Sequence, residues 1–284
     1  MVATLSEREE AILQAVNTYR FLTTSQVCRL FFSENSYNYA GRLLKGLADT
    51  EYLVRFPLPS TERGNRELLY TLGRPGIKFL KSIGCDMQMW SKNALLPPSY
   101  LHMQHSLAVN DFLIAGAVLV KQVPTISLRA LHHEWLLKHN PLTVSLGNAE
   151  VGIVPDGFLD FRLHIHGTTY QTGVWVEVDR GTEDQGCIKQ KVRALYTVLA
   201  REMYRDYLQT GSMVVAFATT AGAPRLKALR LWVEEELKAL GATESNEFFF
   251  LAVLSPEPDP QTLFLRPLWT MPFVEQGQPL LDLS

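Results

Sequence analysis

Apolar and polar residues follow a helical period and then a strand period along the first eighty residues. Ser6 stands three residues before Glu9, which is typical of a capping box, and apolar residues then recur at helical spacing. Two more helices, two strands and a closing helix are expected over residues 23–33, 35–49, 52–56, 68–72 and 77–83. Three helices followed by a strand, a loop and a strand predict a winged helix-turn-helix.

The third expected helix has an apolar stripe and an opposite polar face. Asn38, Arg42 and Lys45 lie on the polar face at i, i+4 and i+7. Arginine and asparagine can read base edges, and lysine can contact phosphate. Arg63 and Arg66 lie in the loop between the two strands, where they could contact a minor groove or a backbone. These five residues are therefore the expected DNA-binding set, and a protein-contact or dimerisation module is the alternative.

Helix and strand patterns alternate from residue 101 onward. The expected elements are, in order, a helix, three strands, a helix, a strand, a helix and a strand, over residues 101–120, 126–137, 151–164, 174–179, 183–208, 213–218, 225–240 and 248–254. This order predicts a mixed sheet covered on both faces, so the fold class is α/β, or α+β overall. The expected divisions are 1–84, a linker at 85–100, a second domain at 101–254, and a Pro-rich tail at 255–284 packing on that domain.

Composition narrows the class of protein. The chain has 284 residues, of which 46% are hydrophobic and 20% charged, as in a globular protein. The N-terminus lacks the pattern of a secretion signal, no apolar run is long enough for a membrane span, and the three cysteines are far apart. We therefore expect a cytoplasmic protein without membrane contact. The net charge is −2, yet basic residues outnumber acidic ones by eight to four between Asn35 and Lys81, as phosphate contact requires.

Three carboxylates form the candidate chemical centre. Asp156 stands between Pro155 and Gly157 in the second expected strand, and Glu177 and Asp179 end the third. Residues two apart on a strand point to the same face, and Asp156 joins them if the strands are antiparallel neighbours. Such a cluster needs a cation, and Mg²⁺ (or Mn²⁺) suits oxygen ligands and phosphate chemistry. Asp156, Glu177 and Asp179 are thus the expected metal ligands.

The ordered motifs resemble a known family. Pro155-Asp156 followed by Glu177-x-Asp179 in an αβββαβ order is similar to the PD-(D/E)xK nuclease-like superfamily, whose fold is that of restriction endonucleases. The chain more closely resembles the replication-relaxation family of bacterial plasmids and mobile elements. The motifs that carry this resemblance are His105 to Asp111, Pro155-Asp156-Gly157, Glu177 to Glu183, and Lys191 with Tyr196. The resemblance implies roles in plasmid replication and in DNA relaxation by nicking.

One position departs from the superfamily pattern. A lysine is expected two residues after the glutamate, but Asp179 stands there. Lys191 on the next helix is our first candidate for the missing cation, and Lys189 is the second. The expected catalytic set is therefore Asp156, Glu177, Asp179 and Lys191. Glu134 is either a further acidic ligand or a surface carboxylate.

Two functions remain open. The first is a Mg²⁺-dependent DNA endonuclease or nickase, and the second is a non-catalytic replication initiator or regulator whose nuclease-like domain serves as a scaffold. Double-stranded DNA is the expected partner of both, with a homodimer as an open alternative. No GxxxxGK phosphate loop, nucleophile elbow or dinucleotide motif occurs, which disfavours an ATPase, a serine hydrolase or a dehydrogenase.

Overall fold

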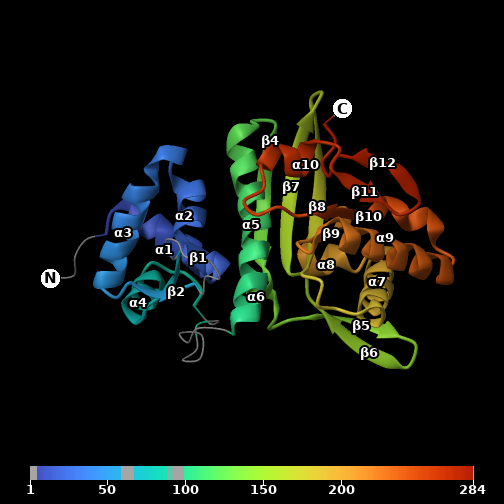
Figure 1. Cartoon of the computed structure of the whole chain (residues 1–284), viewed down its shortest axis with the longest axis horizontal. Coiled ribbons are helices and arrows are strands. Elements are labelled where there is room, and N and C mark those ends of the chain that lie inside the picture. The colour runs from blue at the N-terminus through green and yellow to red at the C-terminus, as the bar shows by residue number, and fades with distance from the viewer. Residues whose placement is uncertain (1–4, 59–66, 88–89, 91–98, 284) are drawn as a thin grey trace. The chain divides into compact units, whose positions relative to one another are not determined.

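The computed structural model describes residues 5–58, 67–87, 90 and 99–283 (Figure 1). The chain divides into one unit that ends at Asn110 and a second that begins at Asp111. Helices and a mixed parallel and antiparallel sheet occur together, which confirms the α/β class.

Helices that begin at capped residues build the first unit. Ser6 and Glu9 form the expected capping box at the start of α1, and Thr23 and Gln26 form a second one at the start of α2. The elements are α1 (Glu7–Tyr19), β1 (Leu22–Thr23), α2 (Thr24–Phe31), η1 (Glu34–Ser36), α3 (Tyr37–Asp49), β2 (Leu53–Pro57), β3 (Leu68–Leu72) and α4 (Arg74–Ser82). The three strands form an antiparallel sheet in the order β1-β3-β2.

Helix α3 buries one side and exposes the other. Ala40, Leu44 and Leu47 are buried in the core of the unit, as the helical period predicts. Leu53 of β2 and Leu69 of β3 are also buried in this unit. The opposite side of α3 carries polar residues and faces solvent.

The first unit extends further along the chain than the pattern predicts. Helix α5 (Tyr100–Gln122) begins near the expected position, but the division falls inside it, after Asn110. Met103 packs with Phe21 and Leu69, and the fully buried Asn110 donates to the carbonyl oxygens of Tyr19 and Phe21, at 3.4 and 2.6 Å. The first half of α5 is thus a structural part of the first unit rather than of the second.

A seven-stranded sheet organises the second unit. Its strands lie in the order β12-β11-β10-β9-β8-β7-β4, and the β8–β9 and β9–β10 pairs are parallel while the others are antiparallel. The sheet strands are β4 (Ile126–His133), β7 (Gly157–Ile165), β8 (Thr168–Asp179), β9 (Met213–Thr219), β10 (Phe249–Val253), β11 (Trp269–Met271) and β12 (Val274–Gln278). A separate hairpin pairs β5 (Leu142–Leu146) with β6 (Ala149–Ile153). The remaining helices are α6 (Glu134–Leu137), α7 (Gln185–Ala200), α8 (Tyr204–Leu208), α9 (Gly222–Ala239), η3 (Thr243–Phe248) and α10 (Pro260–Leu265).

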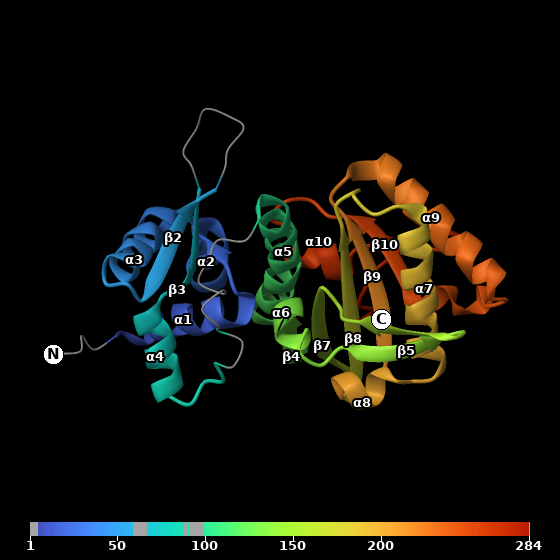
Figure 2. The ribbon, with the colours of Figure 1, turned by 90° about the horizontal axis from the view of Figure 1, so that it is seen from below.

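Helices cover both faces of this sheet. Helices α7 and α9 lie on one face, over a core that includes Trp175 and Phe217 (Figure 2). On the other face Phe112, in the second half of α5, contacts the rings of Phe264 and Trp269. The same half of α5 packs closely on β7, because a Cβ at Gly116 would lie only 2.7 Å from a methyl carbon of Leu159.

Two expected strands and the expected tail differ from the structure. The strand expected at 126–137 ends at His133, whose side chain caps α6, and the one expected at 151–164 is broken at Pro155-Asp156 into β6 and β7. The segment from Ser255 is more than a surface tail. It supplies α10, β11 and β12, because its apolar residues Phe264 and Trp269 are fully buried against the sheet.

By length and composition α5 could cross a membrane. However, 56% of its most apolar window is buried inside the protein, which is typical of a core helix.

The C-terminal segment should contribute strongly to stability. Trp269 is fully buried, its indole Nε1 donates to the carbonyl oxygen of Leu263 at 2.6 Å, and its ring meets Phe112. Trp269→Ala should lower the free energy of unfolding by about 3–5 kcal/mol in urea denaturation. Leu268→Ala, at a neighbouring position that is 37% exposed, should change it by less than about 0.5 kcal/mol. Equal effects of the two changes would contradict a structural role for this segment.

Candidate active site

Strand β8 carries its acidic residues on a covered face of the sheet. Trp175, Glu177 and Asp179 alternate with Val174, Val176 and Val178, so the acidic pair lies on the same side as Trp175, under α7 and α9. Glu177 and Asp179 are only 4% and 5% exposed. Two buried carboxylates require hydrogen bonds or opposite charges, and the structure supplies both.

Asp156 joins this strand from its antiparallel neighbour. Its backbone N–H donates to the carbonyl oxygen of Val176 at 3.0 Å, and its Oδ2 accepts from the backbone N–H of Val178 at 2.7 Å. The carbonyl oxygen of Asp156 accepts from the backbone N–H of Glu134 at 2.9 Å. Asp156 thus lies one residue before the β7–β8 ladder, which starts at the Gly157–Val176 pair, and its carboxylate is held at the end of β8.

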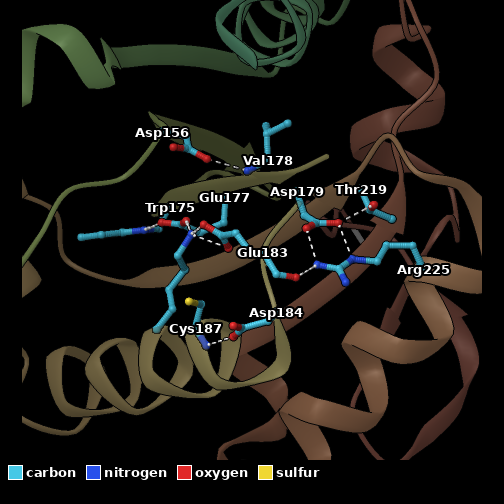
Figure 3. A network of polar contacts seen from close by, with 11 residues as sticks. Asp156, Trp175, Glu177, Val178, Asp179, Glu183, Asp184, Cys187, Thr219 and Arg225 are labelled. Carbon is cyan, nitrogen blue, oxygen red and sulfur yellow. Dashed lines mark hydrogen bonds and ion pairs between the residues drawn. The ribbon is translucent and has the colours of Figure 1, made fainter. Parts of the chain in front are cut away.

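Lys191 lies between two glutamates. Its Nζ is 2.8 Å from Oε2 of Glu177 and 3.3 Å from both carboxylate oxygens of Glu183. The other oxygen of Glu177, Oε1, accepts from Nε1 of Trp175 at 2.7 Å. Figure 3 shows Glu177 between Trp175 and Glu183. The lysine comes from α7, the helix that follows β8, so the loop between them determines whether it reaches the carboxylate.

Burial and charge oppose each other at Glu177. The pKa of its carboxyl group is raised from 4.5 to about 7, because burial and the charge of Asp156 together raise it more than Lys191 and the Trp175 hydrogen bond lower it. Burial alone would lower the pKa of Lys191, but Glu177, Asp156 and Glu183 together raise it. Lys191 therefore stays charged, and Glu177 changes charge near neutral pH.

Asp179 has a different partner from Glu177. Arg225, at the start of α9, donates from Nε to Oδ2 at 2.9 Å and from Nη2 to Oδ1 at 2.7 Å. Thr219 also donates to Oδ2, at 2.8 Å. Burial raises the pKa of Asp179, but the hydrogen bonds from Arg225 and Thr219 outweigh it and hold the pKa below its usual value. Asp179 is therefore ionised and already neutralised by an arginine (Figure 3).

The other expected site residues differ in how near they lie to the acidic centre. Lys189 pairs with Glu235 of α9 at 2.7 Å, so of the two candidate lysines only Lys191 meets the acidic centre. Glu134 pairs with Lys138 at 2.7 Å, and one of its carboxylate oxygens also lies within 4.8 Å of a carboxylate oxygen of Asp156. The side chains of Asn38, Arg42 and Lys45 are exposed on α3, and Arg63 and Arg66 lie outside the described residues.

Sequence reasoning missed Arg225, Thr219 and the contact made by Glu183. Strands β8 and β9 are parallel neighbours, with Asp179 opposite Thr219, so the residues that follow both strands meet at one edge. Arg225 also donates from Nη2 to the carbonyl oxygen of Glu183 at 2.7 Å and thereby holds the loop before α7. A search for a cation just after the next parallel strand could have found it, because Asp179 needs one.

A family model described as replication-relaxation matches residues 13–214, which is more than half of the chain. The chain belongs to the replication-relaxation family. Membership points to a role in the replication or relaxation of plasmids or mobile elements, as the motifs predicted. No curated protein and no solved structure matches the chain.

The family match contains one part of the acidic centre and stops before another. Asp156, Glu177 and Lys191 lie inside the matched range. Thr219 and Arg225, which bind Asp179, lie beyond its end. The hydrogen bonds that Arg225 and Thr219 make to Asp179 are therefore a feature of this structure that the family match does not describe.

The titration of Glu177 can be measured directly. Its side-chain carboxyl ¹³C resonance should titrate with a midpoint of about 7, well above 4.5. Lys191→Met should move the midpoint higher, because the lysine charge lowers the pKa, and Lys189→Met should leave it unchanged. A midpoint near 4.5 in the unmodified protein would contradict this account.

The same shift has a consequence for stability. The folded chain retains a proton on Glu177 that the unfolded chain releases above pH 4.5. The stabilising contribution of Glu177 is thus complete below pH 4.5 and is lost as pH rises through about 7. Glu177→Gln should remove this part of the pH dependence of unfolding.

Proposed function

We propose that the chain binds double-stranded DNA through α3 of its first unit and hydrolyses a DNA phosphodiester with Mg²⁺ at the acidic centre of its second unit. The observation that carries the catalytic part is the contact between Lys191 and Glu177 at 2.8 Å, beside Asp156. It supplies, from a helix, the cation that the superfamily pattern expects on the strand.

The outer face of α3 supports DNA binding. Asn38, Arg42 and Lys45 are exposed together on a helix whose opposite side is buried, as in a helix that enters the major groove. Lys45 pairs with Asp49 at 3.7 Å, but both side chains are more than half exposed. Such a pair contributes little to stability, so Lys45 can exchange Asp49 for a phosphate.

The acidic centre has the donor set that Mg²⁺ prefers. Asp156, just before β7, and Glu177, on β8, contribute carboxylate oxygens, and an ionised carboxylate accepts about four hydrogen bonds or metal contacts in all. The contacts from Val178, Trp175 and Lys191 therefore leave acceptor capacity on these oxygens. Asp179 fits less well, because Arg225 already binds both of its oxygens. We thus propose Asp156 and Glu177 as the metal ligands.

The residues of the centre have distinct roles in hydrolysis. A bound Mg²⁺ would polarise the phosphate and the attacking water. Water would add to phosphorus and lose a proton, the bond from phosphorus to the leaving oxygen would break, and that oxygen would take up a proton, so that one water is consumed and the protons balance. Lys191 is charged and stabilises the negative charge that develops on the phosphate oxygens. With a pKa of about 7, Glu177 is ionised in a large fraction of molecules at neutral pH.

One observation favours the non-catalytic alternative. The Asp179–Arg225 pair fills the position where the superfamily pattern has its lysine, and it is fully satisfied without metal or substrate. A replication initiator or regulator could keep such a domain as a scaffold. The two alternatives differ in whether DNA is cut.

Plasmid relaxation tests the catalytic proposal. With Mg²⁺ or Mn²⁺, the unmodified protein should convert supercoiled plasmid to relaxed circles, while Asp156→Asn and Glu177→Gln should lose this activity. Lys191→Met should reduce the rate about 100-fold or more, since removal of one charge-stabilising group costs roughly this much. Lys189→Met is the matched control, because its lysine pairs with Glu235, and it should keep full activity.

The results separate the two alternatives. If none of these proteins relaxes plasmid while all of them bind DNA, the non-catalytic function is correct. Equal loss of activity in Lys189→Met and Lys191→Met would contradict the role that we give to Lys191.

Salt-dependent binding tests the α3 surface. Replacing Arg42 and Lys45 with alanine should weaken binding to duplex DNA and lower the slope of log K against log salt by about 2, since each lost phosphate contact lowers it by roughly 0.9. Replacing the exposed Lys78 and Lys81 of α4 removes the same charge from another helix and should have a smaller effect. An identical loss in both double variants, measured by fluorescence anisotropy, would show that only net charge matters.

A further inference from the structure

A glycine interrupts the outer face of α3. Gly46 lies within the helix and is exposed, and apart from its two neighbours and the backbone of the helix itself, no atom of the described chain lies within 4 Å of the position that its Cβ would take. Except for proline, glycine is the residue that least favours a helix interior. Its backbone here is not in the left-handed region, so neither conformation nor packing within the described chain requires a glycine.

Gly46 belongs to the same face as the expected DNA-binding residues. It follows Arg42 by four residues and Tyr39 by seven, so the three lie in one row along the helix. Tyr39 is 52% exposed, although it is a large aromatic residue. Phe32 holds its ring edge-on at 5.6 Å, and the guanidinium of Arg42 lies 5.9 Å from its centre. The ring is therefore oriented by its neighbours while half of it faces solvent.

We propose that Gly46 leaves a gap through which duplex DNA approaches the backbone of α3, with Tyr39 as a further DNA-binding residue beside it. This inference rests on the proposed DNA binding. A glycine permits the close approach of a ligand to a helix backbone, and an oriented aromatic ring can contact the apolar edge of a base. The inference assigns roles to two residues outside the set of Asn38, Arg42 and Lys45.

Charge identifies DNA as the occupant. The row through Gly46 includes Arg42, and Lys45 and Asn38 lie directly beside it. A second copy of this chain docking through the same face would bring like charges together, which is unfavourable. A polyanion meets the same residues with opposite charge.

The decisive comparison is between two glycines of one helix. Gly46→Ala should raise the melting temperature by about 4 °C or more, because alanine favours the helix. It should nevertheless weaken binding of a fluorescein-labelled duplex of mixed sequence, and Gly46→Leu should weaken it about tenfold. Gly41→Ala is the matched control, since Gly41 lies on the flank of α3, with Thr24 as its nearest neighbour at 3.9 Å. It should raise the melting temperature and leave binding unchanged.

Tyr39 requires a separate pair of variants. Tyr39→Ala should weaken duplex binding about fivefold, while Tyr39→Phe keeps the ring and should bind nearly as well as the unmodified chain. Equal loss in both variants would assign the effect to the hydroxyl group and would contradict a contact through the ring.

Three results would overturn the inference. If the unmodified chain binds duplex DNA and Gly46→Leu binds it equally well, the gap has no role, although the proposed function stands. If the unmodified chain does not bind duplex DNA, the proposed function fails and the inference fails with it. If Gly46→Leu abolishes self-association in sedimentation while DNA binding is intact, a second copy is the occupant.

Discussion

Two buried carboxylates on one face of β8 determine how the second unit is assembled. Glu177 and Asp179 point into the space between the sheet and its helices, where an unpaired charge is costly. Each is therefore bound by a cation from a different helix, Lys191 from α7 and Arg225 from α9. The two helices that cover this face are thus connected to the same strand by charge as well as by apolar packing.

The Arg225–Asp179 ion pair also affects the position of the residues around Glu177. Arg225 binds the side chain of Asp179 and the backbone of Glu183, so it connects the end of β8 to the loop before α7. The side chain of Glu183 in turn contacts Lys191. The position of the lysine beside Glu177 therefore depends in part on an arginine more than thirty residues further along the chain.

Local patterns predict most of the fold because they report which face of each element is buried. The period of two in β8 correctly places Glu177 and Asp179 on one face, and the capping box of Ser6 starts α1 where it is expected. The pattern does not reveal that Pro155-Asp156 separates two strands, because both flanking segments are apolar enough to form a single strand. It also misses β11 and β12, since their burial depends on a sheet edge formed by residues distant in sequence.

The same distinction explains which part of the site is predictable. Asp156, Glu177 and Lys191 stand out because their spacing follows known motifs, whereas the partner of Asp179 depends on the parallel pairing of β8 with β9. An aspartate at the position of the motif lysine has the wrong charge to assist Glu177. Arg225 neutralises that aspartate, and Lys191 is left as the cation beside Glu177. The departure from the motif is therefore balanced in charge by two residues from two helices, Arg225 beside Asp179 and Lys191 beside Glu177.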